Sequence, residues 1–322
     1  MCSQNQSGIL QLRLQGFGKL FYMETALFIL IFQMYAAALV GNILIILTVL
    51  ESPKLHSPMY FFLSNLSLCE IMFTTVVTPT ILQVLWSSGG TVTLYQCITQ
   101  FYFYASTGAV EILLLNTMAF DRYQAICNPL RYSLTMGSKT QRFLVCLDWV
   151  AGFIVMSIST TAICSLEFCG SSKIDHVFCD LEPIIELSST ETFVVRTIAL
   201  VITILFCFLP FMLIIASYIS IFFTILRISS RTGRLKTFST CSSHLASVFL
   251  YFGSLFIIYL VPSQGNSKKL KKFLSLSFIV LTPMLNPVIY TLRNQDIKTS
   301  LKVYMCYLEQ KYLVHRNFSN RH

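Results

Sequence analysis

Charged residues are scarce in this sequence. Only 11% of its 322 residues are Asp, Glu, Lys or Arg, whereas 55% are apolar. A soluble globular domain usually carries about 25% charged residues, so the composition excludes an ordinary water-soluble protein. A bilayer core about 30 Å thick requires about 20 apolar residues of helix, and the number of such stretches therefore decides the fold class.

Other absences narrow the function. The chain has no internal repeat of the kind that many transporters show. Its five histidines are scattered and no nucleophile–base pair or metal-ligand cluster accompanies them, which argues against an intramembrane enzyme. No basic stretch is interleaved with aromatic residues on a soluble face. The net charge of +9 therefore indicates membrane orientation and contact with anionic lipid, and not nucleic-acid binding.

Seven apolar stretches are long enough to cross a bilayer, and short loops separate them. We therefore predict an all-α membrane protein with one domain, 1–322. The first stretch is too long and uninterrupted for a cleavable signal peptide, and we interpret it as a signal anchor. The predicted spans are 25–50, 58–85, 98–123, 140–163, 193–226, 237–261 and 273–292, between an outer tail, 1–24, and an inner tail, 293–322.

The charges of the loops predict the orientation. Seven spans place the two ends of the chain on opposite sides, and Lys and Arg favour the inside. With the N-terminus outside, 15 of them lie inside and 8 outside. The sequon at Asn5 fits an outer tail that is glycosylated. The exception is a basic run in the last outer loop, made up of Lys268, Lys269, Lys271 and Lys272.

Ionisable residues inside the spans point to a functional path, because each costs at least a few kcal/mol in lipid unless it faces a protein interior. Glu111 and Arg122 are 11 residues apart, about three helical turns, and share one face of the third span. Tyr104 and Gly108 extend that face toward the outside. These two residues either pack against neighbouring helices or line a ligand site.

Glu70 and Glu111 are the two acids expected near the middle of the membrane. Either each is separately protonated and hydrogen-bonded, or they form a shared polar site. Oxygen ligands suit a hard cation, so a sodium ion is a possible occupant of that site.

Prolines inside the spans permit kinks, because each removes a backbone hydrogen bond. They are Pro79, Pro210, Pro283 and Pro287. Pro287 follows Asn286 and precedes Tyr290 by three residues, which places an amide and a phenol beside a weakened turn near the inner face. Such helices give a bundle room to rearrange.

Four sequence blocks match the pattern of one protein family. The most specific is MAFDRYQAICNPLRY at 118–132, at the end of the third span. The others are PMYFFLSNLS at 58–67, KTFSTCSSHL at 236–245 and PMLNPVIY at 283–290, and Gly41-Asn42 in the first span also fits. These blocks resemble the olfactory branch of the G-protein-coupled receptors. The likeness extends from the first span to about Asn294, and the long second outer loop resembles the tetrapod-type class.

This resemblance implies a rhodopsin-like bundle of seven helices that binds small, volatile odorants. It also implies activation of the heterotrimeric olfactory stimulatory G protein, a rise in cyclic AMP, and display in the plasma membrane of sensory-neuron cilia. An ion-coupled transporter or channel is the alternative, since buried acids and kinked helices also serve ion pathways.

Residue by residue, the resemblance implies a disulfide between Cys97 and Cys179 and an ion site at Glu70 and Glu111. The activation switch that it implies comprises Asp121, Arg122, Tyr123, Tyr218, His244, Asn286, Pro287 and Tyr290. Family pocket positions and the helix stripes together predict a ligand pocket in the outer third of the bundle. Its residues are Tyr104, Ala105, Gly108, Ala109, Ile202, Phe206, Phe252, Leu255, Tyr259 and Ile279.

The chain departs from the family pattern at three places. Ser189 stands where a cysteine usually pairs with the one matching Cys169, so we expect a Cys164–Cys169 bridge or a free thiol. The common Phe-Tyr-Gly of the sixth span is Tyr251-Phe252-Gly253, which indicates loss of a hydroxyl at the pocket. Asp148 in the fourth span has no physical explanation from the sequence.

Two features lie on the inner side. Basic residues before the sixth span either guide the G protein or only follow the positive-inside rule. They are Arg227, Arg231, Arg234 and Lys236. Ile297, Leu301, Tyr304 and Leu308 recur at helical spacing with lysines between them, which predicts a short amphipathic helix on the inner leaflet.

Overall fold

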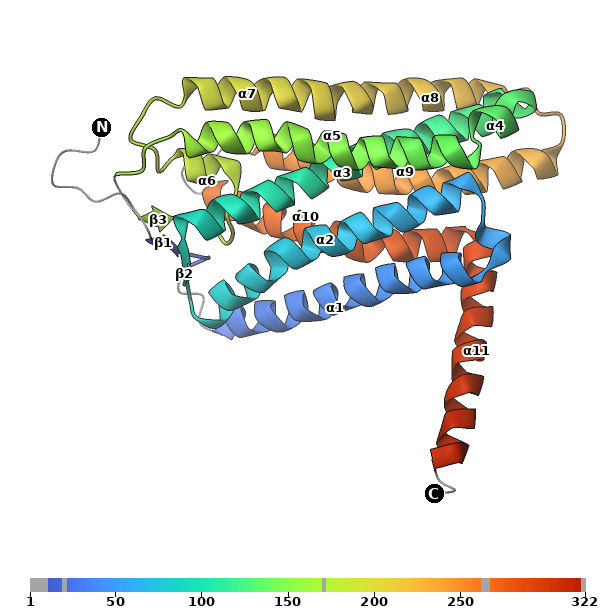
Figure 1. Cartoon of the computed structure of the whole chain (residues 1–322), viewed down its shortest axis with the longest axis horizontal. Coiled ribbons are helices and arrows are strands. Elements are labelled where there is room, and N and C mark those ends of the chain that lie inside the picture. The colour runs from blue at the N-terminus through green and yellow to red at the C-terminus, as the bar shows by residue number, and fades with distance from the viewer. Residues whose placement is uncertain (1–10, 19–21, 170–171, 262–266, 320–322) are drawn as a thin grey trace.

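The computed structural model describes residues 11–18, 22–169, 172–261 and 267–319, and the predicted sequon at Asn5 lies outside them. Among these residues, seven helical stretches are long and apolar enough to cross a membrane, and they pack side by side in one bundle, as predicted (Figure 1). They are α1 (Tyr22–Glu51), α2 (Pro58–Trp86), α3 (Leu94–Cys127), α5 (Ser138–Cys164), a continuous fifth helix (Phe193–Leu226), α9 (Arg231–Leu260) and α10 (Ser267–Arg293).

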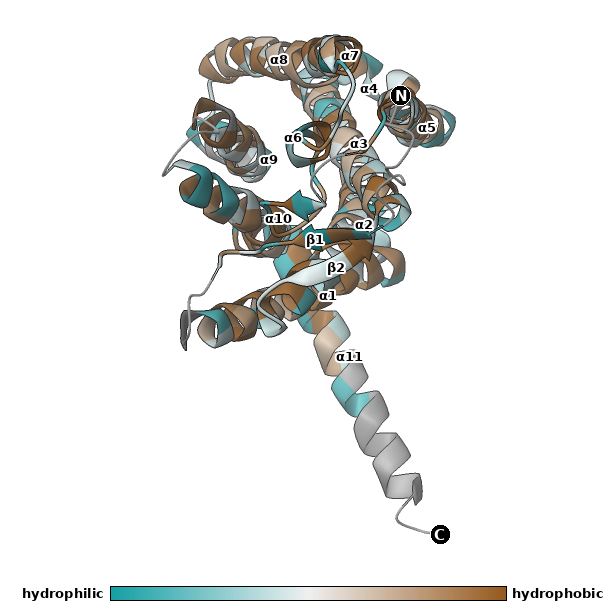
Figure 2. Cartoon of the chain, turned by 90° about the vertical axis from the view of Figure 1, so that its left-hand side faces the viewer, coloured by the Kyte–Doolittle hydropathy of each residue, from teal (hydrophilic) through white to brown (hydrophobic). Residues whose placement is uncertain are grey.

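The outward surface of the bundle is apolar. Figure 2 shows hydrophobic colouring over much of the helical surface. In the fifth helix only 11% of the most apolar window is buried in the protein. An exposed apolar surface of this extent is unfavourable in water, so these faces of the helices contact lipid.

Local sequence explains several helix ends. Pro58 is the first residue of α2, a position where a missing N–H costs nothing. Thr93 and Gln96 form a capping box at the start of α3, in which each side chain accepts from the other residue's backbone N–H, at 3.1 and 2.9 Å. Ser230 accepts from the N–H of Gly233 at the start of α9.

The fifth helix has an irregular middle. It consists of α7 (Phe193–Thr203), the π-helical turn η2 (Ile204–Phe208) and α8 (Leu209–Leu226). Pro210 has no N–H to donate to the carbonyl of Phe206, and the wider turn lies immediately before it. The predicted irregularity at Pro210 is thus a π turn at mid-membrane depth.

One end of the bundle carries a small sheet that the all-α prediction missed. β1 (Gln11–Leu14) lies between β2 (Gly90–Thr93), to which it is antiparallel, and β3 (Lys173–Ile174), to which it is parallel. We call this the sheet end and the opposite end the switch end. Leu12 and Leu14 of β1 are fully buried, so the strand belongs to the core of the sheet end.

A disulfide also holds the sheet end together. Cys97 at the start of α3 is bonded to Cys179 with their Cα atoms 5.3 Å apart, which confirms the pairing implied by the family resemblance. The expected Cys164–Cys169 bridge or free Cys169 is wrong, because Cys169 is disulfide-bonded and Cys164 is a free, exposed thiol. Ser189, in place of the family cysteine, instead accepts from the backbone N–H of Cys169 at 3.0 Å.

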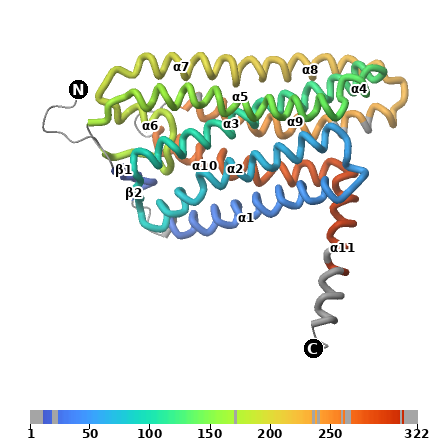
Figure 3. The backbone as a smooth tube through the Cα atoms, in the orientation of Figure 1, coloured from blue at the N-terminus to red at the C-terminus, as the bar shows by residue number. Residues whose placement is uncertain are grey.

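Shorter elements complete the chain. The predicted C-terminal helix is longer than expected, and it leaves the bundle crosswise at the switch end (Figure 3). Its residue Ile297 is buried under the bundle, while Ser300 is 3.0 Å from Ser52, between their hydroxyl oxygens. The remaining elements are η1 (Pro53–Leu55), α4 (Pro129–Thr135), α6 (Leu181–Ile185) and this helix, α11 (Gln295–Ser319).

α5 packs tightly on α3 at Gly152. A Cβ atom built there would lie 2.6 Å from Val110 Cγ2 and 3.2 Å from the carbonyl oxygen of Ser106. Backbone atoms cannot move aside as a flexible side chain can, so α5 requires a glycine at this position.

We expect Gly152→Ala to force α3 and α5 apart and to destabilise the protein by about 1–3 kcal/mol. The measurement is the melting temperature of the purified protein in detergent. Gly253→Ala is the matched control, because a Cβ at Gly253 meets nothing within 4 Å. Equal melting temperatures for Gly152→Ala and the wild type would contradict this packing analysis.

Candidate ligand cavity and polar switch

A cavity of about 150 Å³ lies among α2, α3, α5, the fifth helix, α9 and α10, in the half of the bundle nearer the sheet end. We call it the apolar chamber, since most of its lining is aliphatic or aromatic. The structure brings seven of the ten predicted pocket residues together around it. They are Tyr104, Ala105, Gly108, Ala109, Ile202, Phe206 and Leu255.

Three predicted pocket residues do not appear on its lining. Phe252 is buried against Phe211, with ring centroids 4.8 Å apart, and Ile279 is fully buried in the helix core. Neither side chain lines the apolar chamber, and their part in ligand binding stays a prediction. The side chain of Tyr259 lies outside the described residues.

Tyr251 is one of seven chamber residues that were not predicted; the other six are Phe73, Ile112, Met156, Thr203, Cys207 and Phe278. Tyr251 lines the cavity, and its hydroxyl donates to the carbonyl oxygen of Gly108 at 3.0 Å. The Tyr251 hydroxyl is thus engaged with α3, and the expected loss of a polar anchor for ligands at this depth stays a prediction. Tyr251 precedes Leu255 by four residues, and this spacing on one helix face was the signal that could have found it.

A second hydrogen bond joins the same two helices farther from the sheet end. His244 Nε2 lies 3.1 Å from the carbonyl oxygen of Leu115. Tyr251 and His244 are seven residues apart on α9, and Gly108 and Leu115 are seven apart on α3. Seven residues make about two turns, so one face of α9 meets one face of the antiparallel α3 at two points. We call these the sheet-side bond and the switch-side bond.

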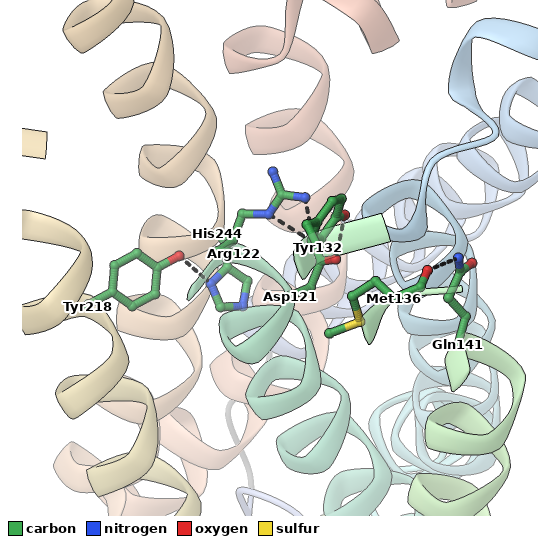
Figure 4. Close-up of polar contacts among 7 residues, drawn as sticks. All are labelled: Asp121, Arg122, Tyr132, Met136, Gln141, Tyr218 and His244. Atoms are coloured by element: carbon green, nitrogen blue, oxygen red, sulfur yellow. Dashed lines mark hydrogen bonds and ion pairs between the residues drawn. The ribbon is translucent and has the colours of Figure 1, made fainter. Parts of the chain in front are cut away.

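The roles of the His244 nitrogens follow from chemistry. A carbonyl oxygen only accepts, so Nε2 carries the proton and donates to Leu115. In the neutral imidazole Nδ1 must then accept, and the hydroxyl of Tyr218 on α8 donates to it at 2.7 Å (Figure 4). The buried His244 thus connects α9 to α3 and α8 together.

Asp121 and Arg122 form the ion pair expected at the end of α3. Arg122 Nη2 lies 2.5 Å from Asp121 Oδ2, and the hydroxyl of Tyr132 on α4 donates to Asp121 Oδ1 at 2.8 Å (Figure 4). Burial, and next the charge of Asp121, raise the pKa of Tyr132, so it remains a donor. Tyr132 was not among the switch residues expected from the sequence. Tyr123, which was, is partly buried next to Arg122.

Glu70 and Glu111 are both buried in the middle of the bundle, on α2 and α3. The amide nitrogen of Asn286 on α10 donates to Glu70 Oε1. Within the described residues, Glu70 Oε2, Glu111 Oε1 and Asn286 Oδ1 have no hydrogen-bond partner. Several oxygens with unused lone pairs are therefore buried in this region.

The motif of the seventh span meets α1 directly. Asn42 Nδ2 donates to the carbonyl oxygen of Pro283 at 3.0 Å. A Cβ at Gly41 would lie 3.0 Å from Pro287, so the small residue allows α1 and α10 to approach closely. Tyr290 is fully buried in the same region. Pro287 has no N–H to donate to the carbonyl of Pro283, four residues earlier. The side chain of Asn42 on α1 donates to that carbonyl instead.

Asp148, which the sequence left unexplained, is buried between α5 and α3. The hydroxyl of Thr117 donates to its Oδ2 at 2.9 Å. The acid therefore faces a neighbouring helix and not lipid, as is expected of an intramembrane carboxyl group.

These features define the class of the protein. Seven apolar helices enclose a chamber near one end and a buried ion pair near the other, an arrangement expected of a membrane receptor that responds to a small ligand.

Comparison with known proteins identifies the family. The olfactory receptor family model matches residues 31–308. Human olfactory receptor 10A2 is 46% identical over 279 residues, covering 87% of this chain and 92% of that protein. Human olfactory receptor 10A3 is 41% identical over 301 residues, covering 94% and 96%. The chain belongs to the olfactory receptor family and is a multi-pass membrane receptor, not an enzyme.

Loss of the sheet-side bond is expected to destabilise the bundle modestly. Tyr251→Phe keeps the ring but removes the hydroxyl, and we expect a cost of about 0.5–1.5 kcal/mol in a thermal melt. Tyr102→Phe is the matched control, since its hydroxyl is 3.5 Å from its nearest acceptor, Phe153 O, and contributes little. The interpretation is wrong if Tyr251→Phe and Tyr102→Phe have the same melting temperature.

Proposed function

We propose that this receptor binds small, largely apolar odorants in the apolar chamber and then activates a stimulatory G protein that raises cyclic AMP. In this proposal the sheet end and the N-terminus lie outside the cell, in the ciliary membrane of olfactory sensory neurons. The observation that carries it is the pair of hydrogen bonds between α9 and α3, which connect the chamber to the switch end.

The chemistry of the chamber supports apolar ligands. Burial of an odorant is favoured by about 25 cal/mol for each Å² of apolar surface removed from water. The hydroxyl of Tyr251 is already engaged with Gly108, so the chamber offers few fixed polar contacts. Affinity is therefore expected to be modest and the tuning broad.

Transmission would run along α9. A ligand against Tyr251 and Leu255 acts on the same helix face whose next contact toward the switch end is His244. A ligand shifts the balance of two states only by its differential affinity, and about 1.4 kcal/mol changes their ratio tenfold. Loss of the switch-side bond would let α9 move away from α3, and Arg122 would then leave Asp121 and meet the G protein.

Basic residues lie near the same end. Arg227 ends the fifth helix, and Arg231 and Arg234 open α9 with exposed side chains, while the side chain of Lys236 lies outside the described part of the chain. Their positive charge would guide an acidic surface of the G protein. The positive-inside rule accounts for them equally well.

A reporter-cell assay tests the proposal. We expect at least one odorant of a broad panel to raise cyclic AMP in transfected cells, and Arg122→Ala to abolish the rise at equal surface density. An N-terminal epitope stained on intact cells measures that density and the orientation together. Arg142→Ala, on the lipid-flanking start of α5, is the matched control and keeps the response.

Two results would contradict the proposal. A cyclic AMP response that survives Arg122→Ala would remove the ion pair from the mechanism. An odorant-independent ion current or solute uptake would favour the channel or transporter alternative.

We further propose that a sodium ion binds at Glu70 and Glu111 in the resting state. The buried oxygens without hydrogen-bond partners on Glu70, Glu111 and Asn286 suit a hard cation, which takes oxygen ligands. The ion would add positive charge between two acids that otherwise repel each other. It would thereby stabilise the packing of α2, α3 and α10 in one arrangement.

Sodium is then expected to raise the melting temperature of the purified receptor, compared with choline at equal ionic strength, by mass action. Glu111→Gln removes the charge with little change of shape and should abolish this difference. Asp148→Asn, which changes a buried acid elsewhere, should retain it. The sodium proposal is wrong if the wild type melts identically in both salts.

A further inference from the structure

A second cavity lies directly outside the apolar chamber. It has a volume of about 370 Å³ and is enclosed by the segment between β3 and the end of α6, together with α9 and α10. We call it the vestibule. It shares Tyr104, Leu255 and Phe278 with the apolar chamber, so the two cavities are adjacent.

The vestibule differs from the chamber in its chemistry. It is lined by acidic residues of the loop and by Lys268, Lys271 and Lys272 of α10. These lysines belong to the basic run that is the exception to the positive-inside rule. Lys272 of that run is buried and donates to Asp175 at 2.5 Å and to the carbonyl oxygen of Gly16 at 2.9 Å. This lysine therefore holds the N-terminal segment and the loop onto α10.

One buried polar atom in the vestibule lacks a partner. His176 is 7% exposed and lines the cavity, and its Nδ1 makes no hydrogen bond with the described residues. An unpaired buried polar atom is costly, and a ligand that supplies a partner recovers that cost. His176 is thus the polar contact that the apolar chamber does not provide.

Aromatic contacts connect this histidine to the apolar chamber. The ring of His176 packs on the edge of Phe178, with centroids 4.7 Å apart, and Phe178 packs on Tyr104 at 5.4 Å. Tyr104 belongs to both cavities. A chain molecule lying along these rings would place its ends in different chemical environments.

The charge pattern favours a neutral ligand head. Lys268 and Lys271 face the same space as Asp180 and Glu186, so an ion of either sign would meet like charge. Burial is the largest cause that lowers the pKa of His176, and the charge of Lys272 adds to it, while the charges of Asp180 and Asp175 and the backbone of Phe178 oppose it; the net direction is downward, so the imidazole is neutral at physiological pH. Depending on its tautomer, Nδ1 then accepts or donates one hydrogen bond. A hydroxyl group satisfies either tautomer, because it both donates and accepts.

We infer that this receptor prefers alcohols, whose hydroxyl group bonds His176 in the vestibule while the hydrocarbon part fills the apolar chamber. The inference rests on the proposed function and specifies its ligand class. It makes His176 a determinant of specificity that lies outside the seven helices.

The test compares straight-chain primary alcohols with hydrocarbons of equal size, such as 1-octanol with nonane, in the reporter cells. The wild type should respond to the alcohol at about tenfold lower concentration, the effect of one buried hydrogen bond. His176→Phe keeps an aromatic ring on Phe178 and should reduce that ratio to about one. His176→Asn places an amide near the position of Nδ1 and should restore the preference.

His56→Phe, the same substitution at an exposed histidine far from the vestibule, should leave the ratio unchanged. Surface staining of each variant separates loss of folding from loss of recognition. A His176→Phe receptor at the surface with an intact alcohol preference would overturn the inference. So would a wild type activated only by odorants without a hydroxyl group. If no odorant of a broad panel acts on the wild type, the proposed function itself fails, and the inference fails with it.

Discussion

Two hydrogen bonds from α9 to backbone carbonyls of α3 are the contacts on which the proposed mechanism depends. Tyr251 donates to Gly108 beside the apolar chamber, and His244 donates to Leu115 two turns farther in. Lipid offers no competing hydrogen-bond partners, so each bond is retained while the helices stay in contact. If the helices separate, the donors need new partners. This requirement favours two discrete arrangements of α9 over a continuous series.

Buried polar groups of the bundle make hydrogen bonds between helices. Asp148 meets Thr117, Asn42 meets the carbonyl freed by a proline, and Asn286 meets Glu70. Each joins two helices, so the buried polar groups act at helix contacts. Apolar packing alone would hold many rotations of a helix about its axis, because lipid and side chains are similarly apolar. The polar contacts select one of them.

Much of the fold was predictable from residue patterns. The apolar runs predicted the seven helices, and the 3.6-residue period correctly placed Tyr104, Gly108, Glu111 and Arg122 on one interior face of α3. The sheet was not predictable, since strands of four and two residues are too short to show alternation. Phe252, a predicted pocket residue, does not line the apolar chamber, because a family position does not fix the rotation of a helix about its axis. One residue corresponds to about 100° on a helix, so the adjacent Tyr251 faces the chamber instead. The position of His176 was not predictable, because it depends on a loop held in place by the disulfide of Cys179 and by Lys272. No local sequence pattern indicates those contacts.

The account is tested most directly by the distance between α4 and the first turn of α9, both at the switch end, measured by pulsed electron paramagnetic resonance. Spin labels at Thr232 and Leu134, both exposed, would be placed in a protein whose other exposed cysteines are serine. His244→Phe removes the switch-side bond, and without any ligand it should shift the distance distribution toward longer separations. An unchanged distribution in a folded His244→Phe protein would show that this bond does not hold α9 in place.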